Sequence, residues 1–215
     1  MGGGEGYLAS LFEGVRHRVV VDAVAPALRI ARERGMAAVE ADVRRLPFRD
    51  AACDLVLMAD ILEHLPAEDV PATLAEAARV LRPGGVALVN TSCYGLYLRR
   101  WLRRAPGGGR LDRDDLKDGH LNRFAAAELK RAVREAGFKI KKKRYFKHLF
   151  QPLTALVTSL VSGGGEGEPA AENKERRLES PLARALNAGR IFVAGWDAFL
   201  FGWLPGGAVI YKLVK

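Results

Sequence analysis

Cysteine is scarce in this sequence, which has only Cys53 and Cys93 among its 215 residues. Both lie in apolar stretches, so we expect reduced thiols that pack as small core side chains and not a disulfide framework. Residues 1–6 are glycine-rich and acidic, without the basic and then apolar order of a secretory signal. We therefore expect a cytoplasmic protein.

Acidic residues are fewer than basic ones, 25 against 34, which gives a net charge of +9. A positive field attracts nucleic acid, anionic membranes and acidic substrates alike, so charge alone does not select a partner. Internal repeats are also absent. A length of 215 residues with 49% hydrophobic content suits one domain with a substantial core, and we predict a single domain over residues 1–215.

Helical and extended patterns alternate along the chain. Strands are expected at 18–22, 37–41, 53–59 and 86–90, and helices at 5–12, 26–34 and 67–81. This alternation predicts an α/β fold, namely a Rossmann-like, doubly wound and mostly parallel sheet with helices on both faces. A surface loop at 99–113, a helix at 125–136 and an antiparallel C-terminal hairpin of strands 138–146 and 206–214 complete the expected order.

The two hairpin strands are separated by an insertion, residues 147–205, far longer than the two to five residues of an ordinary hairpin loop. Its last apolar stretch, 182–204, is long enough to cross a bilayer, but Arg190 and Asp197 would each be costly at the bilayer centre. We therefore expect a lid or an in-plane helix that rests on a membrane surface. A helix pair packed on the sheet as ordinary core is the alternative.

Glycines at alternate positions, Gly2, Gly4 and Gly6, open the chain. Glycine permits positive φ and close approach of the backbone to a nucleotide, whereas a mobile glycine-rich terminus is the alternative. A dinucleotide fingerprint would need a third glycine where Tyr7 stands, which disfavours a nicotinamide dehydrogenase. Asp22 then closes an apolar strand, where a carboxylate can accept hydrogen bonds from both hydroxyls of a ribose. A turn or helix-capping aspartate is the alternative.

Five local patterns occur in a fixed order. They are the glycine loop; Val19-Val20-Val21-Asp22 with 27–32; 40–43 with Leu46-Pro47-Phe48; 54–56 through Glu63-His64-Leu65; and 79–85, which ends in Arg82-Pro83-Gly84-Gly85. A sixth, softer match covers 119–124, 128–129 and 136–138. From residue 2 to about residue 146 the chain resembles the class I S-adenosylmethionine-dependent methyltransferases of the type that includes the quinone-biosynthesis enzymes.

The resemblance implies S-adenosylmethionine as the cofactor, with no metal. Gly2, Gly4 and Gly6 would pass beneath the methionine and ribose portions of the cofactor, and Asp22 would hold the ribose hydroxyls.

The resemblance also assigns the two ends of the cofactor. Asp42 would accept a hydrogen bond from the adenine amino group, and the Val43 N–H would donate to an adenine nitrogen. Leu46 would pack near the ring. Met58 and Ala59, at the end of the fourth strand of the family's sheet, would flank the amino acid portion.

Two histidines are the catalytic candidates. His64 would face the methyl donor or the substrate, and His120 lies with Arg123 where the family often places substrate contacts, although local backbone or solvent could satisfy either histidine. Methyl transfer is an in-line displacement that depends mainly on alignment and desolvation. A hydroxyl acceptor needs a general base, and His64 or His120 suits that role because imidazole titrates near neutrality. The predicted function is methyl transfer to a small-molecule or lipid-like acceptor.

Two other functions were weighed against this one. Enzymes that methylate a base amino group usually carry an Asn- or Asp-Pro-Pro-aromatic motif after the fourth strand, where this chain has Met58-Ala59-Asp60-Ile61, so nucleic acid is disfavoured as a partner. A non-catalytic binding protein on a degenerate methyltransferase fold is the other alternative. Intact Asp22 and Asp42 argue against such decay.

The family's first strand, which precedes the glycine loop, is missing from this sequence. That strand is central, so its absence predicts an open slot between the strands at 18–22 and 53–59, with unpaired backbone groups on both. Each buried unpaired group costs about 1 to 3 kcal/mol. We therefore expect the 215-residue chain to be poorly stable and to bind its cofactor weakly, and translation to begin upstream of Met1.

Overall fold

The computed structural model describes residues 1–12, 14–93, 111, 113–146 and 208–215. In chain order the elements are α1 (Tyr7–Ser10), β1 (Val19–Asp22), α2 (Ala25–Glu33), β2 (Ala37–Glu40), β3 (Cys53–Ala59), the 3₁₀ turn η1 (Leu62–His64), α3 (Asp69–Val80), β4 (Leu81–Ser92), α5 (Arg113–Lys117), α6 (Ala126–Glu135), β5 (Lys139–Phe146) and β6 (Ala208–Val214). The predicted insertion 147–205 and most of the predicted loop 99–113 lie outside these residues.

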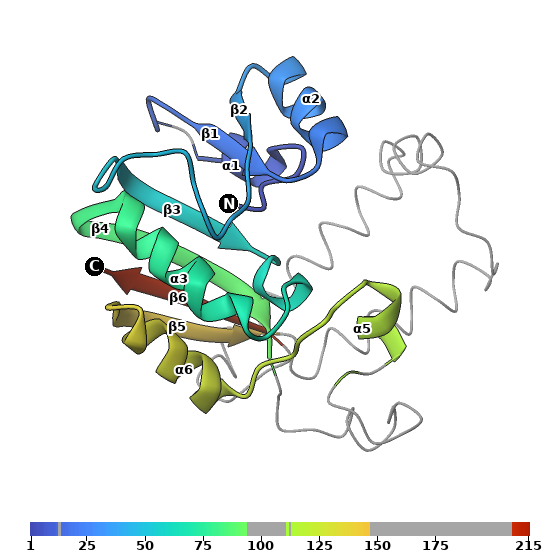
Figure 1. The fold of residues 1–215 in the computed structure, drawn as a ribbon, viewed down its shortest axis with the longest axis vertical. Coiled ribbons are helices and arrows are strands. Elements are labelled where there is room, and N and C mark those ends of the chain that lie inside the picture. The colour runs from blue at the N-terminus through green and yellow to red at the C-terminus, as the bar shows by residue number, and fades with distance from the viewer. Residues whose placement is uncertain (13, 94–110, 112, 147–207) are drawn as a thin grey trace.

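The strands form two sheets (Figure 1). β1 and β2 pair in parallel, and the second sheet has the order β3-β4-β6-β5. β3 and β4 are parallel, whereas β6 is antiparallel to both of its neighbours. The α/β fold and the antiparallel C-terminal hairpin are therefore confirmed.

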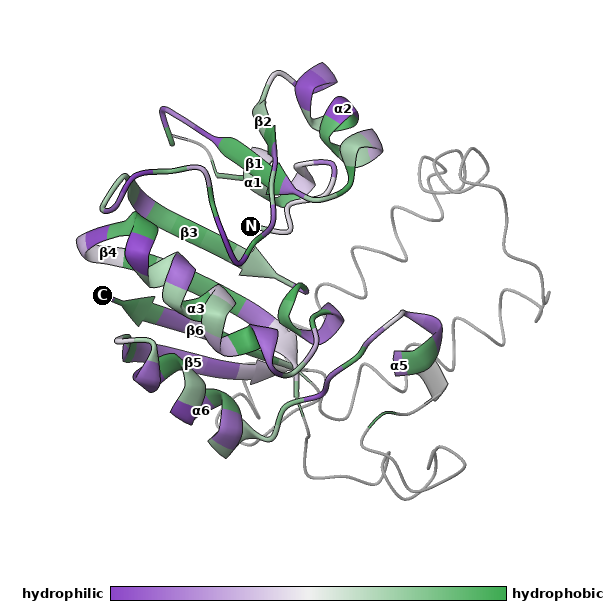
Figure 2. Ribbon diagram, in the orientation of Figure 1, coloured by the Kyte–Doolittle hydropathy of each residue, from purple (hydrophilic) through white to green (hydrophobic). Residues whose placement is uncertain are grey.

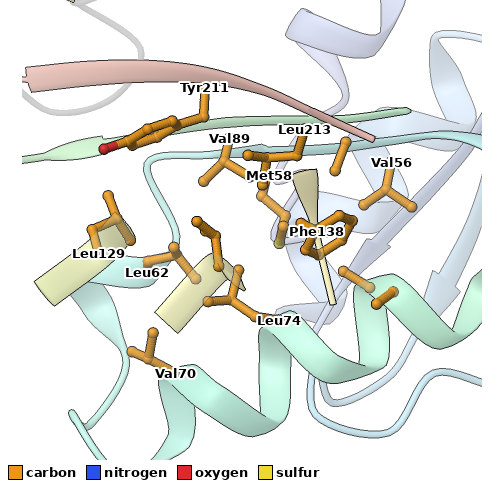
Figure 3. Close-up of a cluster of buried hydrophobic side chains, with 14 of the residues drawn as sticks. Val56, Met58, Leu62, Val70, Leu74, Val89, Leu129, Phe138, Tyr211 and Leu213 are labelled. Atoms are coloured by element: carbon orange, nitrogen blue, oxygen red, sulfur yellow. The ribbon is translucent and has the colours of Figure 1, made fainter. Parts of the chain in front are cut away.

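The main core lies between the larger sheet and helices α3 and α6, which cover one of its faces (Figures 1 and 3). Alternate strand residues point toward these helices, as period-two burial requires. The helices supply buried side chains at helical spacing. Side chains that meet in this layer include Val56, Met58, Val70, Leu74, Val89, Leu129, Tyr211 and Leu213.

Strand β5 of the larger sheet is largely hydrophilic (Figure 2). It is the edge strand of that sheet, and the side chains from Lys141 to Arg144 are exposed. Lysines on an edge strand discourage further strand pairing. The basic residues of β5 therefore form a solvated edge of the sheet.

The predicted slot between the strands at 18–22 and 53–59 is present as a break between the two sheets, because β1 and β3 do not pair. Residues near the amino end lie in this break (Figure 1). The Met1 amino group donates to the Leu57 carbonyl of β3 at 2.9 Å, and the Gly3 N–H donates to the Val21 carbonyl of β1 at 3.0 Å. Burial lowers the pKa of the Met1 amino group to about 6.

The Arg82-Pro83-Gly84-Gly85 turn lies inside β4 and not before it. Leu81 pairs with Cys53, after which the register jumps to Val86 opposite Leu55. The turn is closed by the last residue of the chain, because the Gly84 N–H donates to the Lys215 carbonyl and the Lys215 N–H donates to the Gly85 carbonyl, both at 3.1 Å.

Cys53 and Cys93 are both free thiols, as predicted. None of the helices in the described ranges has the length and apolar content needed to cross a membrane.

Candidate functional site

The glycine loop has a backbone that side chains would disturb. Gly2, Gly4 and Gly6 have φ values of +58°, +51° and +78°. A Cβ at Gly2 would lie 2.6 Å from Cδ1 of Ile61, and one at Gly6 would collide with Met36. Nothing lies within 4 Å of the corresponding position at Gly4. Two of the glycines are therefore required by packing, and Gly4 leaves open space at a left-handed backbone position.

Asp22 ties this loop to the end of β1. Its Oδ2 accepts from the Gly4 N–H at 2.8 Å and its Oδ1 accepts from the Val24 N–H at 3.0 Å. Its carbonyl also accepts from the Ala41 N–H at 3.1 Å, which joins the end of β1 to the residue after β2. The carboxylate predicted to hold a ribose thus already orders the glycine loop, with lone pairs remaining on both oxygens.

Asp42 has an unexpected partner in Arg44. Its Oδ1 accepts from the Arg44 backbone N–H at 2.8 Å, and its Oδ2 accepts from the Arg44 Nε at 2.9 Å. The same guanidinium reaches Asp69 through Nη1 at 2.8 Å. Hydrogen bonds from Arg44 lower the pKa of Asp42. The predicted acceptor for the adenine amino group is exposed, but Arg44 engages both of its oxygens.

The neighbouring cofactor candidates are anchored to the core. Val43 and Leu46 are buried, and the Leu46 N–H donates to Glu76 of α3 at 2.6 Å. The side chain of Met58 is fully buried among the core residues of Figure 3, so a role beside the cofactor is left only to its backbone. The prediction that Met58 flanks the amino acid portion of the cofactor thus concerns its backbone. Ala59, at the end of the same strand, is half-buried.

Asp60 and Asn90 form a polar pair where β3 and β4 end. Asp60 has an unusual φ of +50°, and its N–H donates to the Asn90 carbonyl at 3.0 Å. The Asn90 Nδ2 donates to Asp60 Oδ1 at 2.9 Å. Asn90 Oδ1 is buried and, among the described residues, has no hydrogen-bond donor. A buried acceptor in this state is suited to a ligand that brings an N–H or O–H group.

Glu63 holds three segments together at the same edge. It is only 1% exposed, and its carboxylate accepts from Thr91 Oγ1 at 2.7 Å and from the Ser92 N–H at 3.1 Å. Its carbonyl accepts from the N–H groups of Leu121 and Asn122, at 2.7 and 2.9 Å. This residue therefore places η1 beside the end of β4 and beside the segment that follows His120.

His64 and His120 meet at this edge. They are distant in the sequence, since Gly119, the neighbour of His120, comes 55 positions after His64. Their ring centroids are 4.9 Å apart in an edge-to-face arrangement. His64 Nδ1 lies 3.2 Å from the Gly119 carbonyl, and His120 Nδ1 lies 3.0 Å from Asp115 Oδ1. The two histidines selected separately from the sequence thus form one cluster.

No group of three or more His, Cys, Asp or Glu side chains within the described parts of the chain could hold a metal ion.

A family model described as a methyltransferase domain matches residues 1–89, from the glycine loop into β4. The matched region carries the loop, Asp22, Asp42 and the start of the histidine cluster. Residues 1–89 therefore carry the pattern of a methyltransferase domain, and the chain is similar to S-adenosylmethionine-dependent methyltransferases. S-adenosylmethionine is the cofactor of this family.

Three curated relatives of this chain differ in what their names say they act on. A probable S-adenosylmethionine-dependent methyltransferase of Mycolicibacterium smegmatis is 34% identical over 143 residues, which cover 65% of this chain and 50% of that protein. A malonyl-[acyl-carrier protein] O-methyltransferase of Serratia marcescens is 36% identical over 97 residues, 44% of this chain and 37% of that protein. A probable tRNA methyltransferase 9B of Homo sapiens is 35% identical over 74 residues, 34% of this chain and 16% of that protein.

The chain thus spans half the length, or less, of these relatives. Among solved structures, a S-adenosylmethionine-dependent methyltransferase from Archaeoglobus fulgidus aligns with a TM-score of 0.61 at 13% identity, covering 100% of this chain and 83% of that one. At this identity the likeness concerns the fold alone, and it confirms the Rossmann-like class.

The candidate site fits S-adenosylmethionine in three respects. Gly4 leaves open space on a left-handed backbone, Asp22 lies against the same loop, and Asn90 Oδ1, at the neighbouring strand end, is a buried acceptor without a donor among the described residues. The Asp42–Arg44 pair is the one departure, since Asp42 must share or give up a donor to bind adenine.

Sequence reasoning missed three residues of this site: Arg44, Glu63 as a bridging group, and Asp115. Glu63 was present only as part of the Glu-His-Leu pattern, and its burial depends on contacts with β4 and with 121–122. Asp115 precedes His120 by five residues. An acidic residue five positions before His120, a candidate base, was the one sequence signal that could have identified Asp115.

Proposed function

We propose that this methyltransferase transfers the methyl group of S-adenosylmethionine to a small-molecule or lipid-like acceptor. The observation that carries the proposal is that the Asp22-anchored glycine loop abuts Ile61, three residues before His64 in the histidine cluster. Cofactor-binding groups and candidate proton acceptors therefore lie at the carboxyl ends of neighbouring strands, where ligands bind in open α/β sheets.

The bound cofactor supplies an activated methyl group on a sulfonium. The protein's part is to align the acceptor with that group and to exclude water. Gly4 and Asp22 would orient the cofactor, Asn90 would accept a hydrogen bond from a ligand, and His64 or His120 would take a proton from a hydroxyl acceptor.

The class of acceptor is supported by the sequence and by one relative. The chain lacks the proline-containing motif associated with methylation of flipped bases. One relative is named as acting on a malonyl-acyl carrier protein. The relative named as a tRNA methyltransferase keeps nucleic acid as a candidate to be tested. We further propose a cytoplasmic protein whose insertion, residues 147–205, contacts a membrane peripherally, which rests on the sequence alone.

The test starts with calorimetry of S-adenosylmethionine and S-adenosylhomocysteine binding to the full chain. The protein is then incubated with methyl-labelled cofactor and, separately, with a lipid extract, a water-soluble metabolite extract and unmodified tRNA. Label in the lipid or metabolite fraction is expected. Label in tRNA alone would contradict the proposed acceptor class.

A non-catalytic binding protein is the second candidate, and the break between β1 and β3 favours it. Cofactor binding without methyl transfer to any of the three fractions would support that candidate. The membrane proposal has its own test: a chain lacking residues 151–204 should lose binding to anionic liposomes, and unchanged liposome binding together with an unchanged acceptor range would contradict it.

A further inference from the structure

We infer that Asp115 is a positioning residue that fixes His120 with a free Nε2, and that this methyltransferase therefore uses His120 as the proton acceptor for a hydroxyl-bearing substrate. The inference rests on the proposed function and makes it more specific. It selects one of the two histidines, adds a residue that the sequence did not indicate, and names oxygen as the methylated atom.

The geometry around Asp115 determines which nitrogen of His120 carries the proton. Asp115 is only 2% exposed, and its Oδ1 lies 3.0 Å from His120 Nδ1 and 3.1 Å from Arg123 Nη2. Arg123 forms an ion pair with this carboxylate, and a carboxylate in an ion pair accepts hydrogen bonds and donates none. In neutral His120 the proton must therefore lie on Nδ1, which leaves the lone pair on Nε2.

The backbone holds His120 in the same place. Its N–H donates to the Asp115 carbonyl at 2.8 Å, so Asp115 contacts both the main chain and the ring of His120. The following residue, Leu121, donates to the Glu63 carbonyl at 2.7 Å, which ties the segment to η1. The His120 side chain is 12% exposed, so the ring is largely enclosed but is not completely buried.

His64 differs from His120 in the kind of partner that holds it. Within the described ranges its Nδ1 meets the Gly119 carbonyl, at 3.2 Å, and the residue is exposed. A neutral carbonyl does not compensate a positive ring, whereas the Asp115 carboxylate stabilises an imidazolium as it forms. Of the two rings, His120 is therefore the one prepared to receive a proton.

The reaction step balances as follows. The hydroxyl oxygen of the acceptor forms a bond to the methyl carbon while the methyl–sulfur bond breaks and its electron pair stays on sulfur. The hydroxyl proton moves to His120 Nε2 and later leaves to solvent. A neutral amine attacks with a lone pair it already has, so it gains little from a base at this step, whereas a hydroxyl is a poor nucleophile until its proton is removed.

The first experiment reads the tautomer of His120 directly. Two-bond proton–nitrogen correlation spectra of the full, nitrogen-15-labelled chain are recorded at a pH where the ring is neutral, and the signals are assigned with the variant His120→Gln. The wild-type ring is expected to carry its proton on Nδ1. In Asp115→Asn the ring is expected to lose this single tautomer, whereas Asp118→Asn, an exposed acid in the same segment, should leave it unchanged.

A merely structural role for Asp115 would not set the tautomer. A wild-type His120 with its proton on Nε2 would overturn the inference even if Asp115→Asn failed to fold, and so would a tautomer unchanged in a folded Asp115→Asn.

In the second experiment, products made from methyl-labelled cofactor and the metabolite extract are analysed by carbon NMR. Methyl groups on oxygen are expected, and methyl groups on nitrogen or carbon would overturn the substrate class. Failure of the cofactor to bind in calorimetry would count against the proposed function and would leave the tautomer result standing.

Discussion

The two sheets differ in how much buried packing supports them. The four-stranded sheet and its helices share a cluster of 22 buried hydrophobic residues, whereas β1, α2 and their surroundings share a cluster of four: Val20, Leu28, Ala31 and Met36. The smaller part nevertheless carries Asp22 and the glycine loop packs on it, while the larger part carries the histidines. The candidate residues for cofactor binding thus lie mainly in the β1–β2 part, which has the smaller buried core. The candidate residues for proton transfer lie in the part with the four-stranded sheet, which has the larger core.

Few contacts join the two parts. Val21 of β1 belongs to the larger cluster, and Met1 and Gly3 contribute hydrogen bonds across the break. Regions with little buried apolar surface open at lower free energy than the whole fold. A ligand that binds only the closed form stabilises it in proportion to its affinity and concentration. The comparison therefore predicts that the cofactor consolidates the β1–β2 part.

The largest expected effect comes from truncating one leucine in each part. Leu74 and Leu28 are both fully buried. Leu74→Ala should lower the free energy of global unfolding by about 2 to 5 kcal/mol, the usual range for such a cavity. Leu28→Ala should lower it less, and should chiefly speed hydrogen exchange in β1 and β2. Urea unfolding and native-state hydrogen exchange measure the two effects, and equal losses of protection throughout both sheets would contradict the division.

The second effect tests whether the smaller part binds the cofactor. Asp22→Ala removes the candidate partner of two ribose hydroxyls and the acceptor for Gly4, so S-adenosylmethionine binding should weaken by about 2 to 3 kcal/mol. Calorimetry measures this loss. Asp54→Ala, an exposed acid on β3 paired with Arg82, is the matched control and should bind normally. Unchanged affinity in Asp22→Ala would remove the ribose assignment.

The third effect concerns the break itself. In the chain that begins at Met1, burial lowers the pKa of the amino group to about 6 from the ordinary value of 8.0. Below pH 6 the group is charged in both states and its burial opposes folding in full, and above pH 8 it is neutral in both. The free energy of unfolding should therefore rise by about 2 kcal/mol between pH 6 and pH 8, at a slope of about 1 kcal/mol per pH unit.

Urea unfolding at pH 6, 7 and 8 measures this slope. Histidines titrate in the same range, so the control is the same chain acetylated at Met1, which keeps the histidines and lacks the ionisable amine. A slope that is the same in both chains would mean that the amine is not buried in the break.

Elements with strong local patterns could be predicted from the sequence. The apolar run of β3 has the predicted bounds of 53–59, and the amphipathic helix α6 lies within the predicted 125–136. The Arg82-Pro83-Gly84-Gly85 turn precedes the uninterrupted pairing of 86–90 with β3, as predicted, but β4 begins earlier, at Leu81. The hydrogen bonds of this turn to Lys215 could not be predicted, because Lys215 lies at the other end of the chain.

Only some residues of the candidate site could be predicted from the sequence. For Asp22, an acidic residue at the end of one strand was enough to suggest a binding role. The cross-chain contacts of the site were not predictable. The Glu63 bonds to Thr91 and the meeting of His64 with His120 arise from the tertiary fold. The Arg44 grip on Asp42 is local, but its geometry was not encoded in any pattern that distinguishes it from a solvated arginine.

The smallest expected effect concerns the interaction between Arg44 and Asp42. Arg44 is exposed and holds both oxygens of Asp42, the candidate acceptor for adenine in the smaller part. Exposed ion pairs are weak because water competes for both charges. Arg44→Ala should therefore tighten S-adenosylmethionine binding, by less than about fivefold, because the adenine amino group no longer competes with a guanidinium. Arg45→Ala, the exposed neighbour, is the control and should not change the affinity. Weaker binding in Arg44→Ala would mean that the arginine itself contributes to the cofactor site, and Asp42 would then serve to orient Arg44 and not to contact adenine.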